Sequence, residues 1–437
     1  MKICFLPICF LLLCQTALSQ SFSNWITGDT ADYVTDDYLP GIVLAGGGGD
    51  NDDAMKWMLQ RAGGGDVVVL RASGSDGYNN YFFSQLGVNV NSVETIRFNN
   101  AAAANDPYVL QQIQRAEVLF IAGGDQYDYY QYWKGTPVGD AINFLLNEKK
   151  ITVGGTSAGM AILGDAYYAP PGSSAQSAQL LANPFHPNAN ILGKGDFLHP
   201  PFLSDLVTDT HYDQRDRAGR HVTFMARLAA EHDIRTFGIA CNEYTAVCIN
   251  EDGIASVFGE HPDYDDFAYF LQVNCQDEFL PEILQSATPL TWNRSMAAVK
   301  ACRVPGLVDG SNTFDLNDWQ TTVGGEWFDW YVENGSLFKM PEAVPDCAPI
   351  GTSVGDPIGE SAYFQITPNP ASDFIIVKKT APGEALLKLF APTGQMVFQQ
   401  KLNGPVTRIG LTRLTAGLYF ALLEMDGKVF CEKMLVK

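Results

Sequence analysis

Positively charged residues are scarce in this chain of 437 residues. It contains 28 Lys and Arg against 49 Asp and Glu, which gives a formal net charge of −21. The imbalance is uneven, because residues 363–437 carry nine basic and five acidic side chains, which leaves about −26 on residues 20–362. Such an acidic body argues against nucleic acid and anionic membranes as partners. It also makes any cluster of arginines within it conspicuous.

Metal-binding and nucleotide-binding patterns are missing as well. No C-x-x-C pair occurs among the nine cysteines, so we expect no metal site. The glycine run Gly46–Gly49 has neither the G-K-[ST] ending of a phosphate loop nor a G-x-G-x-x-G frame. The sequence therefore predicts a protein that works without a cofactor.

Long apolar runs are confined to the start of the chain. Residues 1–19, MKICFLPICFLLLCQTALS, have the layout of a secretory signal peptide and are too short for a convincing membrane span. Six cysteines remain beyond it, and in an oxidising compartment we expect some of them to pair, although the sequence does not choose the pairs. These are Cys241, Cys248, Cys275, Cys302, Cys347 and Cys431.

Strand-like and helix-like stretches alternate from Gly41 to about Gly164. Apolar runs that end in glycine are separated by amphipathic stretches, which indicates βαβ units and a mainly parallel sheet with functional groups at the carboxyl ends of its strands. Further on, we expect a helix that begins just after His211 and two strands in residues 236–259, joined by a turn at Glu251–Gly253.

The last part of the chain has a different composition. Residues 347–362 are rich in Gly, Pro and Ser and read as a linker. Residues 363–437 show short alternating strands, with turns at Pro392–Gly394 and Asp426–Gly427. This pattern predicts a small all-β sandwich.

A serine stands between glycines directly after the apolar run ITV. Gly155-Thr156-Ser157-Ala158-Gly159 fits the G-x-S-x-G frame, in which small neighbours let a strand turn sharply into a helix and leave the serine hydroxyl exposed. Ser157 is therefore a candidate nucleophile.

Such a serine needs a base, and all six histidines lie between His186 and His261. His211 is distinctive because it precedes a run that contains Arg215, Arg217 and Arg220. A charged run is usually a solvated helix face. Three arginines in an acidic body, close to a candidate base, are better explained as a carboxylate clamp, since guanidinium groups bind carboxylates bidentately.

These motifs together resemble peptidase family S51, which includes the cyanophycinases. The resemblance rests on GGTSAG, GGDQ at Gly123–Gln126, H-x-x-Q-R-x-R-x-x-R from His211, and GIACNEYTAV around Glu243. It implies a catalytic domain over residues 20–346 with a three-layer αβα fold like that of class I glutamine amidotransferases.

The resemblance also implies roles for individual residues. Ser157 would be the nucleophile, His211 the general base and Glu243 the acid that orients the base. The oxyanion hole would be formed by backbone amides of Ala158 and of Gly124 or Asp125, and the substrate pocket by Gln126, Asp209, Arg215, Arg217 and Arg220. Cyanophycinases carry glutamine where this chain has Thr210, so one hydrogen bond of the pocket is in question.

Residues 363–437 resemble the C-terminal sorting domain of type IX secretion substrates. The resemblance lies in Pro368-Asn369-Pro370-Ala371, in Gly417-Leu418-Tyr419 and in the closing KMLVK. It implies that the secretion machinery is a partner and that the protein is secreted or held at the cell surface. The sequence leaves a homodimer open.

The leading hypothesis is a secreted serine exopeptidase that hydrolyses cyanophycin to β-Asp-Arg dipeptides. The alternatives are an Asp-directed dipeptidase, another S51 peptidase, and a catalytically idle binding protein at the cell surface. An α/β-hydrolase would place the acid before the histidine, which would make His232 or His261 the base. Neither of these has a pocket-like context.

Overall fold

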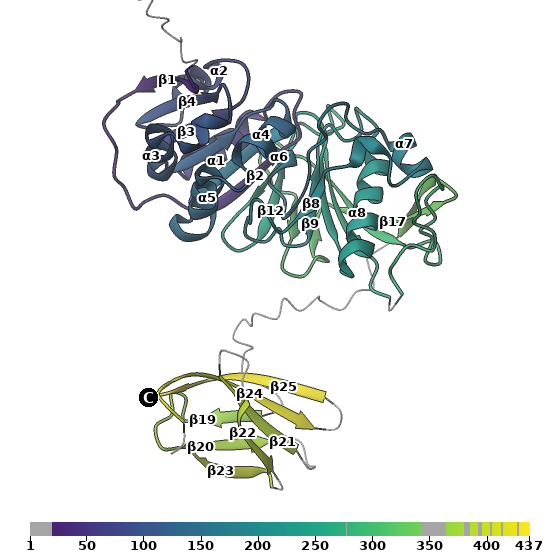
Figure 1. Cartoon of the computed structure of the whole chain (residues 1–437). Helices are drawn as coiled ribbons and strands as arrows, with labels where there is room; N and C mark the ends of the chain where they lie inside the picture. The colour runs from purple at the N-terminus through teal and green to yellow at the C-terminus, as the bar shows by residue number, and fades with distance from the viewer. Residues whose placement is uncertain are drawn as a thin grey trace, which may run out of the picture. The chain divides into compact units, whose positions relative to one another are not determined.

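A computed structural model of the chain describes residues 20–276, 278–342, 364–379, 385–391, 396–402, 404–411, 414–425 and 428–437. The chain divides into two compact units, Met1–Gly351 and Thr352–Lys437, which are drawn in Figure 1. The expected signal peptide, the expected linker and the expected turns at Pro392–Gly394 and Asp426–Gly427 lie outside the described residues.

The larger unit contains a ten-stranded sheet. In spatial order its strands are β1 (Phe22–Gly28), β4 (Ser92–Phe98), β3 (Asp66–Arg71), β5 (Val118–Ile121), β6 (Thr152–Thr156), β2 (Gly41–Ala45), β11 (Ala246–Ile249), β12 (Ile254–Phe258), β15 (Thr313–Asp315) and β16 (Thr322–Val323). The five strands from β4 to β2 are mutually parallel, and the others pair antiparallel. The predicted parallel sheet at the centre of a mixed α/β unit is confirmed.

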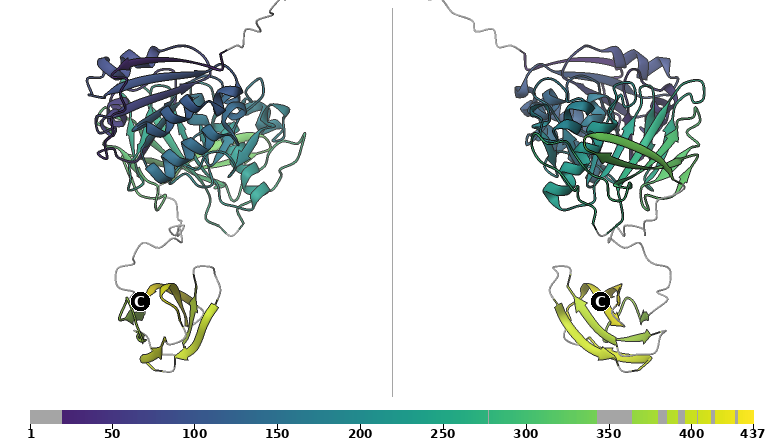
Figure 2. Two further views of the ribbon diagram at one scale, coloured as in Figure 1. Left: turned by 60° about the vertical axis from the view of Figure 1, so that its left-hand side comes forward. Right: turned by 90° about the vertical axis from the view of Figure 1, so that its right-hand side faces the viewer.

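Helices cover this sheet on both faces. On one face α1 (Asp52–Gln60) and the π-helix η1 (Tyr81–Gln85) pack on Val43, Val67 and Phe120. On the other face, buried residues of α3 (Pro107–Arg115), α4 (Gln126–Trp133) and α5 (Pro137–Phe144) share a cluster with Leu44 and Val68. Figure 2 shows helices of this half lying against the sheet. The remaining helices of this half are α2 (Gly77–Asn80), η2 (Ala101–Asn105), η3 (Leu145–Lys149) and α6 (Ala158–Ala161).

A second, eight-stranded sheet is present that the sequence pattern did not predict. In spatial order its strands are β18 (Ser336–Glu342), β17 (Glu326–Glu333), β14 (Val299–Pro305), β13 (Phe267–Val273), β10 (Phe237–Cys241), β9 (Leu206–Asp209), β7 (Ala166–Tyr168) and β8 (Leu192–Lys194). Only β7, β9 and β10 run parallel to one another. Buried residues of both sheets, such as Val247 and Phe270, form one core, so here a sheet takes the place that the three-layer expectation gave to helices.

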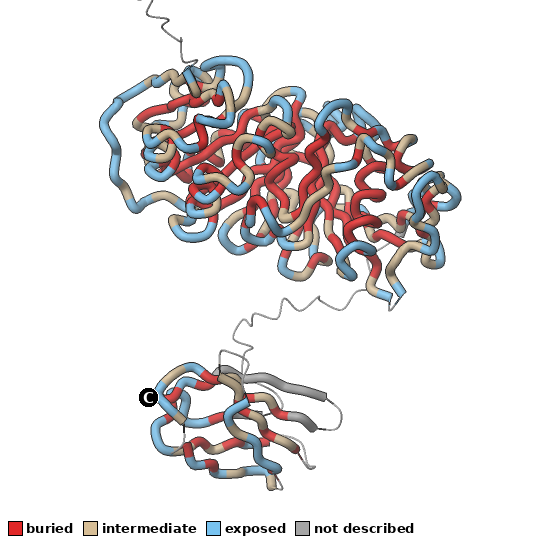
Figure 3. Tube along the Cα trace, in the orientation of Figure 1, coloured by how far each residue is buried: buried red, intermediate tan, exposed pale blue. Residues whose placement is uncertain are grey.

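The other face of the second sheet is covered by α7 (Ser177–Ala182) and α8 (Ala218–His232). A short 3-10 helix, η4 (Pro187–Ala189), follows α7. Buried residues are concentrated along the strands of the larger unit, and exposed residues on its outer loops (Figure 3). The likeness to class I glutamine amidotransferases stays a prediction.

Two local predictions were wrong. The helix expected just after His211 begins at Ala218, because His211 and Asp216 have positive φ angles of 49° and 47° that no α-helix contains. Residues 236–259 hold three strands and not two, because β10 belongs to the second sheet while β11 and β12 form a hairpin in the first.

Four cysteines of the larger unit lie in the part of the chain that the structure describes. Cys241, Cys248 and Cys302 are free and buried, whereas Cys275 is disulfide-bonded. The expectation that some cysteines pair is therefore met at Cys275. Within the described ranges no helix is long and apolar enough to cross a membrane.

The smaller unit is entirely β in its described residues. One sheet contains β19 (Phe364–Thr367), β20 (Phe374–Lys379) and β23 (Val406–Gly410), and the other contains β22 (Met396–Leu402), β21 (Ala385–Phe390), β24 (Gly417–Met425) and β25 (Lys428–Val436). Buried residues from both sheets, among them Ile375 and Leu387, form a single core. Two sheets around one core are the arrangement of a β-sandwich.

Candidate active site

Ser157 stands at a sharp turn between β6 and α6. Its φ of 51° and ψ of −111° lie in a region that non-glycine residues rarely adopt. A Cβ on Gly155 would lie 2.5 Å from the backbone of Gly159, and a Cβ on Gly159 would lie 2.1 Å from the carbonyl oxygen of Ile121. The two glycines of the motif therefore let the turn close, and the turn sets the serine at the carboxyl end of the parallel strands.

Three side chains from different loops form a chain of hydrogen bonds. Ser157 Oγ lies 2.8 Å from His211 Nε2, and His211 Nδ1 lies 2.6 Å from Glu243 Oε1. Ser157 comes from the first sheet and His211 follows β9 of the second, while Glu243 lies in the loop that crosses from β10 to β11. The first of the two strands expected in residues 236–259 is thus interrupted next to the glutamate, where Tyr244 has a φ of 61°.

The surroundings of the His211 imidazole lower its pKa. Burial lowers the pKa of His211, the hydrogen bond to Glu243 raises it, and the positive charges of Arg215 and Arg217 lower it, with a net shift below the usual value. The imidazole is therefore neutral at neutral pH. Its Nδ1–H donates to the carboxylate of Glu243, so Nε2 is free to accept the proton of the Ser157 hydroxyl.

Asn242 ties together the loops that carry His211 and Glu243. The side chain is fully buried; its Nδ2 donates to Asp213 Oδ2 at 3.0 Å and to the Asp265 carbonyl at 2.8 Å, and its Oδ1 accepts from the Asp213 amide at 3.1 Å. Sequence reasoning did not find this residue, although an asparagine inside the apolar run GIACNEYTAV is a signal for a buried polar anchor.

The backbone of the glycine run Gly46–Gly49 packs closely against the side chains of Ser157, His211 and Glu243. A Cβ on Gly47 would lie 2.5 Å from the His211 ring and 2.9 Å from Ser157 Cβ, and a Cβ on Gly48 would lie 2.7 Å from Glu243 Cβ. The Gly46 carbonyl accepts the His211 amide at 2.9 Å, and the Gly47 carbonyl accepts the Tyr244 amide at 2.9 Å. The sequence of the run does not predict this place, because it depends on packing between residues distant in the chain.

The residues expected to form the oxyanion hole flank Ser157. Ala158 is the first residue of α6, and the loop of Gly124 and Asp125 follows β5. A Cβ on Gly123 would lie 3.5 Å from Ser157 Cβ, so this loop adjoins the serine. Asp125 caps α4 by accepting the Tyr127 amide at 2.9 Å. The oxyanion role of Ala158, Gly124 and Asp125 stays a prediction.

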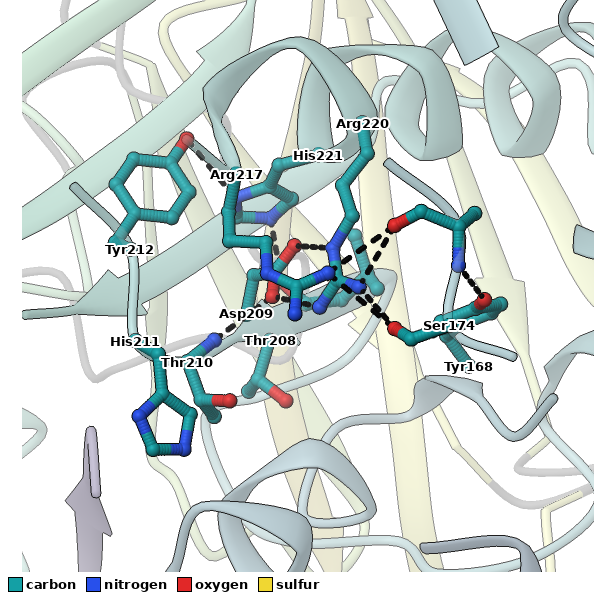
Figure 4. Close-up of polar contacts among 12 residues, drawn as sticks. Tyr168, Ser174, Thr208, Asp209, Thr210, His211, Tyr212, Arg217, Arg220 and His221 are labelled. Atoms are coloured by element: carbon teal, nitrogen blue, oxygen red, sulfur yellow. Dashed lines mark hydrogen bonds and ion pairs between the residues drawn. The ribbon is translucent and has the colours of Figure 1, made fainter. Parts of the chain in front are cut away.

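Arg220 does not belong to an open clamp. Its Nε and Nη2 donate to the two oxygens of Asp209 at 2.8 and 2.5 Å, and both side chains are almost fully buried (Figure 4). The charge of Arg220 holds the pKa of Asp209 below its usual range despite the cost of burial. Asp209 and Arg220 thus satisfy each other's hydrogen bonds, and the expectation that they belong to the substrate pocket stays a prediction.

The other two arginines differ from Arg220 and from each other. Arg215 is half exposed, with its Nη2 3.9 Å from Glu243 Oε1. Arg217 is partly buried, and no carboxylate of the described chain lies within ion-pair distance of it. Burial, with the adjacent charge of Arg220, lowers the pKa of Arg217 to about 10. Of the three, Arg217 is the one without a carboxylate of the described residues within ion-pair distance.

The remaining predicted residues lie around these groups. Gln126 is the first residue of α4, partly exposed, next to the Gly124 loop. Thr210 is buried, and its amide donates to Asp209 Oδ1 at 2.8 Å. Among the residues described, no group of three or more His, Cys, Asp and Glu side chains is arranged to hold a metal ion.

Family models match two parts of the chain. Residues 76–257 match peptidase family S51, and residues 365–437 match the secretion system C-terminal sorting domain. The first range contains Ser157, His211 and Glu243. Both resemblances noted in the sequence are thus confirmed, and the second indicates export by type IX secretion to the cell surface or beyond.

Curated relatives are cyanophycinases of low identity. The cyanophycinase of Synechococcus elongatus is 27% identical over 172 residues, which are 39% of this chain and 48% of the relative. That of Geminocystis herdmanii is 27% identical over 180 residues, which are 41% of this chain and 58% of the relative. The alignments therefore span about half the length of these relatives. Together with the family match they support a serine-type peptidase.

A solved structure of a peptidase from an acI-B1 Actinobacterium is also similar. It is 14% identical, with a TM-score of 0.36, and the alignment covers 52% of this chain and 89% of that one. A score this low carries no argument about function.

Proposed function

Because residues 76–257 resemble peptidase family S51 and hold a hydrogen-bonded Ser157, His211 and Glu243, we propose that the protein is a secreted serine-type exopeptidase that hydrolyses cyanophycin to β-Asp-Arg dipeptides. The observation that carries the proposal is the continuous hydrogen-bond chain from the serine through the imidazole to the carboxylate. Release of β-Asp-Arg leaves the side-chain amide to arginine intact, so the bond that breaks is a peptide bond of the aspartate backbone.

In the first half of the reaction Ser157 forms an ester with the substrate. Its hydroxyl proton passes to His211 Nε2 while Oγ attacks the scissile carbonyl carbon, and Glu243 stabilises the imidazolium that forms. The negative oxygen of the tetrahedral intermediate accepts hydrogen bonds from the Ala158 amide and from an amide of the Gly124 loop. The imidazolium then gives its proton to the leaving nitrogen, and the C–N bond breaks.

The second half restores the enzyme. Water gives a proton to His211 and its oxygen attacks the ester carbon. The intermediate collapses when Ser157 Oγ takes the proton back and leaves, and the new carboxyl group is released. No step requires a metal ion or a cofactor.

Arg217 supports the choice of a substrate that bears a free carboxylate. Arg217, Arg220 and Asp209 together carry one uncompensated positive charge in a partly buried position. A buried charge without a partner is costly, and a bound carboxylate would compensate it. The same observation favours the second candidate, an Asp-directed dipeptidase. The Arg217 guanidinium would bind the side-chain carboxylate of the aspartate, whichever residue follows it in the dipeptide.

The proposal is tested by incubating residues 20–437 with purified cyanophycin and with α-Asp-X dipeptides, followed by mass spectrometry of the products. Dipeptides of β-Asp-Arg mass from the polymer are expected, and none with Ser157→Ala. Cleavage of α-Asp-X alone would establish the dipeptidase. If wild-type protein and Ser157→Ala behave alike on both substrates, the proposed function is wrong.

A further inference from the structure

We propose that Ser174 and Ala175, in the segment between β7 and α7, position the guanidinium of Arg217 so that its Nε edge receives a single substrate carboxylate. The inference rests on the proposed function and names how that site selects its substrate. Residues 170–176 contain no helix or strand and are called the 170–176 segment below.

The hydrogen bonds of Arg217 leave one edge of its guanidinium unused. Nη1 donates to Ser174 Oγ at 3.3 Å and to the Ala175 carbonyl at 3.1 Å. Nε is buried and has no hydrogen-bond partner. A guanidinium has five N–H groups in a fixed planar fork, so holding Nη1 fixes the direction in which Nε–H points. A carboxylate at that edge would satisfy a buried donor that is otherwise left without a partner.

The neighbouring guanidinium is not available for a second carboxylate. Arg220 Nη1 donates to the same two acceptors, Ser174 Oγ at 2.7 Å and the Ala175 carbonyl at 3.2 Å, while Nε and Nη2 are bound to Asp209. Figure 4 shows the two guanidinium groups side by side, with Ser174 on one side of them and the Asp209 carboxylate on the other. Arg217 and Arg220 carry two positive charges and Asp209 one negative charge, so one further carboxylate would neutralise the cluster.

The 170–176 segment is itself braced, so it orients Arg217 and is not merely held by it. Ala175 is buried and its amide donates to the Tyr168 hydroxyl at 2.8 Å; that hydroxyl donates to the Asn188 carbonyl at 2.6 Å. On the other side, Ser177 Oγ accepts the Arg220 amide at 3.0 Å. A binding group is held to its working geometry when its supports are locked by bonds of their own. Ser174 is therefore a positioning residue and not a catalytic one.

The experiment measures how well small ligands protect Ser157 from a neutral organophosphorus label. The ligands are N-acetyl-aspartic acid amide, which has one carboxylate, N-acetyl-asparagine amide, which has none, and N-acetyl-aspartic acid, which has two. The proteins are wild type, Ser174→Ala, Ser174→Thr and the control Ser173→Ala, whose side chain is exposed. The labelling rate without ligand reports whether Ser157 and His211 still work together.

Wild type is expected to bind the monocarboxylate at least tenfold more tightly than the amide, and the dicarboxylate no more tightly than the monocarboxylate. Ser174→Ala should weaken binding of the monocarboxylate about tenfold, or about 1.4 kcal/mol, and leave the amide and the unprotected labelling rate unchanged. Ser174→Thr keeps a hydroxyl and should restore most of the affinity, while Ser173→Ala should match wild type.

Three results would overturn the inference: no preference of wild type for the carboxylate, equal weakening of all ligands in Ser174→Ala, or loss of unprotected labelling in Ser174→Ala. The last would place the segment in the support of Ser157 and His211. Because protection is measured without turnover, these results are separate from those of the cyanophycin experiment. A protein that hydrolyses neither test substrate but still shows the expected protection pattern would refute the proposed function, while it would still show that Ser174 positions Arg217 to bind a carboxylate.

Discussion

At the scale of single residues, Glu243 shows how a charge is retained at low cost. Its carboxylate accepts the Nδ1–H of His211 at 2.6 Å, and its amide donates to Gln214 Oε1 at 3.0 Å. The side chain is partly exposed at 25%, so it keeps some of its hydration while it orients the imidazole. The residue contacts His211 through one oxygen, which makes its contribution separable from substrate binding.

Glu243→Gln should lower kcat by roughly two to four orders of magnitude, because the amide keeps the shape, removes the charge and favours the wrong imidazole tautomer. KM should stay within a few-fold of wild type, since the residue does not touch substrate. Steady-state kinetics on the accepted substrate measure both, and Glu148→Gln, an exposed glutamate of η3, is the matched control. Near-normal kcat would show that another group, or none, supports His211.

The electrostatic surroundings of His211 predict a direction for the pH dependence. Burial, Arg215 and Arg217 lower the pKa of His211, and the base must be neutral to work, so activity persists until the pH falls through this lowered pKa. Removing the charge in Arg215→Gln should raise the pKa of His211 and move the acidic limb of kcat/KM to higher pH. The pH profile of kcat/KM measures this. A limb that stays in place would show that solvent screens the half-exposed Arg215 from the imidazole.

At the scale of structural elements, the site lies where the two sheets meet. The first sheet supplies Ser157 and the glycine run, and the second supplies His211 from the end of β9. The His211 amide donates a hydrogen bond to the Gly46 carbonyl. This bond directly connects the loop after β9 to the glycine run after β2. The geometry of the catalytic groups thus depends on how the sheets pack as much as on the turn at Ser157.

Gly48→Ala tests the glycine run against a matched control, Gly64→Ala. The two glycines have similar positive φ angles of 77° and 80°, but a Cβ on Gly48 would lie 2.7 Å from Glu243 Cβ, whereas a Cβ on Gly64 would meet nothing within 4 Å. Each change should destabilise the fold by about 1–2 kcal/mol through backbone strain. Only Gly48→Ala should also displace Glu243 and lower kcat, by about tenfold or more.

Urea unfolding measures the first effect and kinetics the second. Equal kcat values for Gly48→Ala and Gly64→Ala would mean that Glu243 keeps its contact with His211 when it shifts. The glycine at position 48 would then be needed only for the backbone conformation of the run.

At the scale of the whole molecule, the two units carry separate tasks. Every predicted site residue lies in Met1–Gly351, while the range that matches the sorting domain, residues 365–437, lies in Thr352–Lys437. We therefore expect the larger unit to work without the smaller one, and the smaller one to serve export.

A chain that ends at Gly351 should therefore keep kcat/KM within about twofold of the full chain. The same truncation should remove export from the native host, since residues 365–437 match the sorting domain. Assays of purified proteins, and of culture medium against cell fractions, measure the two effects. Loss of activity in the truncated chain would show that the smaller unit contributes to the site.

The sequence by itself determined the features that depend on local geometry. A strand followed by G-x-S-x-G has few ways to turn, so the position of Ser157 was predictable, and so was the parallel sheet, because buried parallel strands require apolar runs. The order Ser157, His211, Glu243 came from a resemblance in motifs. The hydrogen bonds that join these side chains agree with that order, while their catalytic roles stay a prediction.

Only the tertiary structure decided which charges are paired and which segments meet. Asp209 and Arg220 lie 11 positions apart and read equally well as substrate groups, until packing buries them against each other and leaves Arg217 unpaired. The second sheet, the glycine run against Glu243 and the 170–176 segment against Arg217 were likewise out of reach. Each depends on contacts between residues distant in the sequence, and composition and periodicity describe only how a segment is built, not what it packs against.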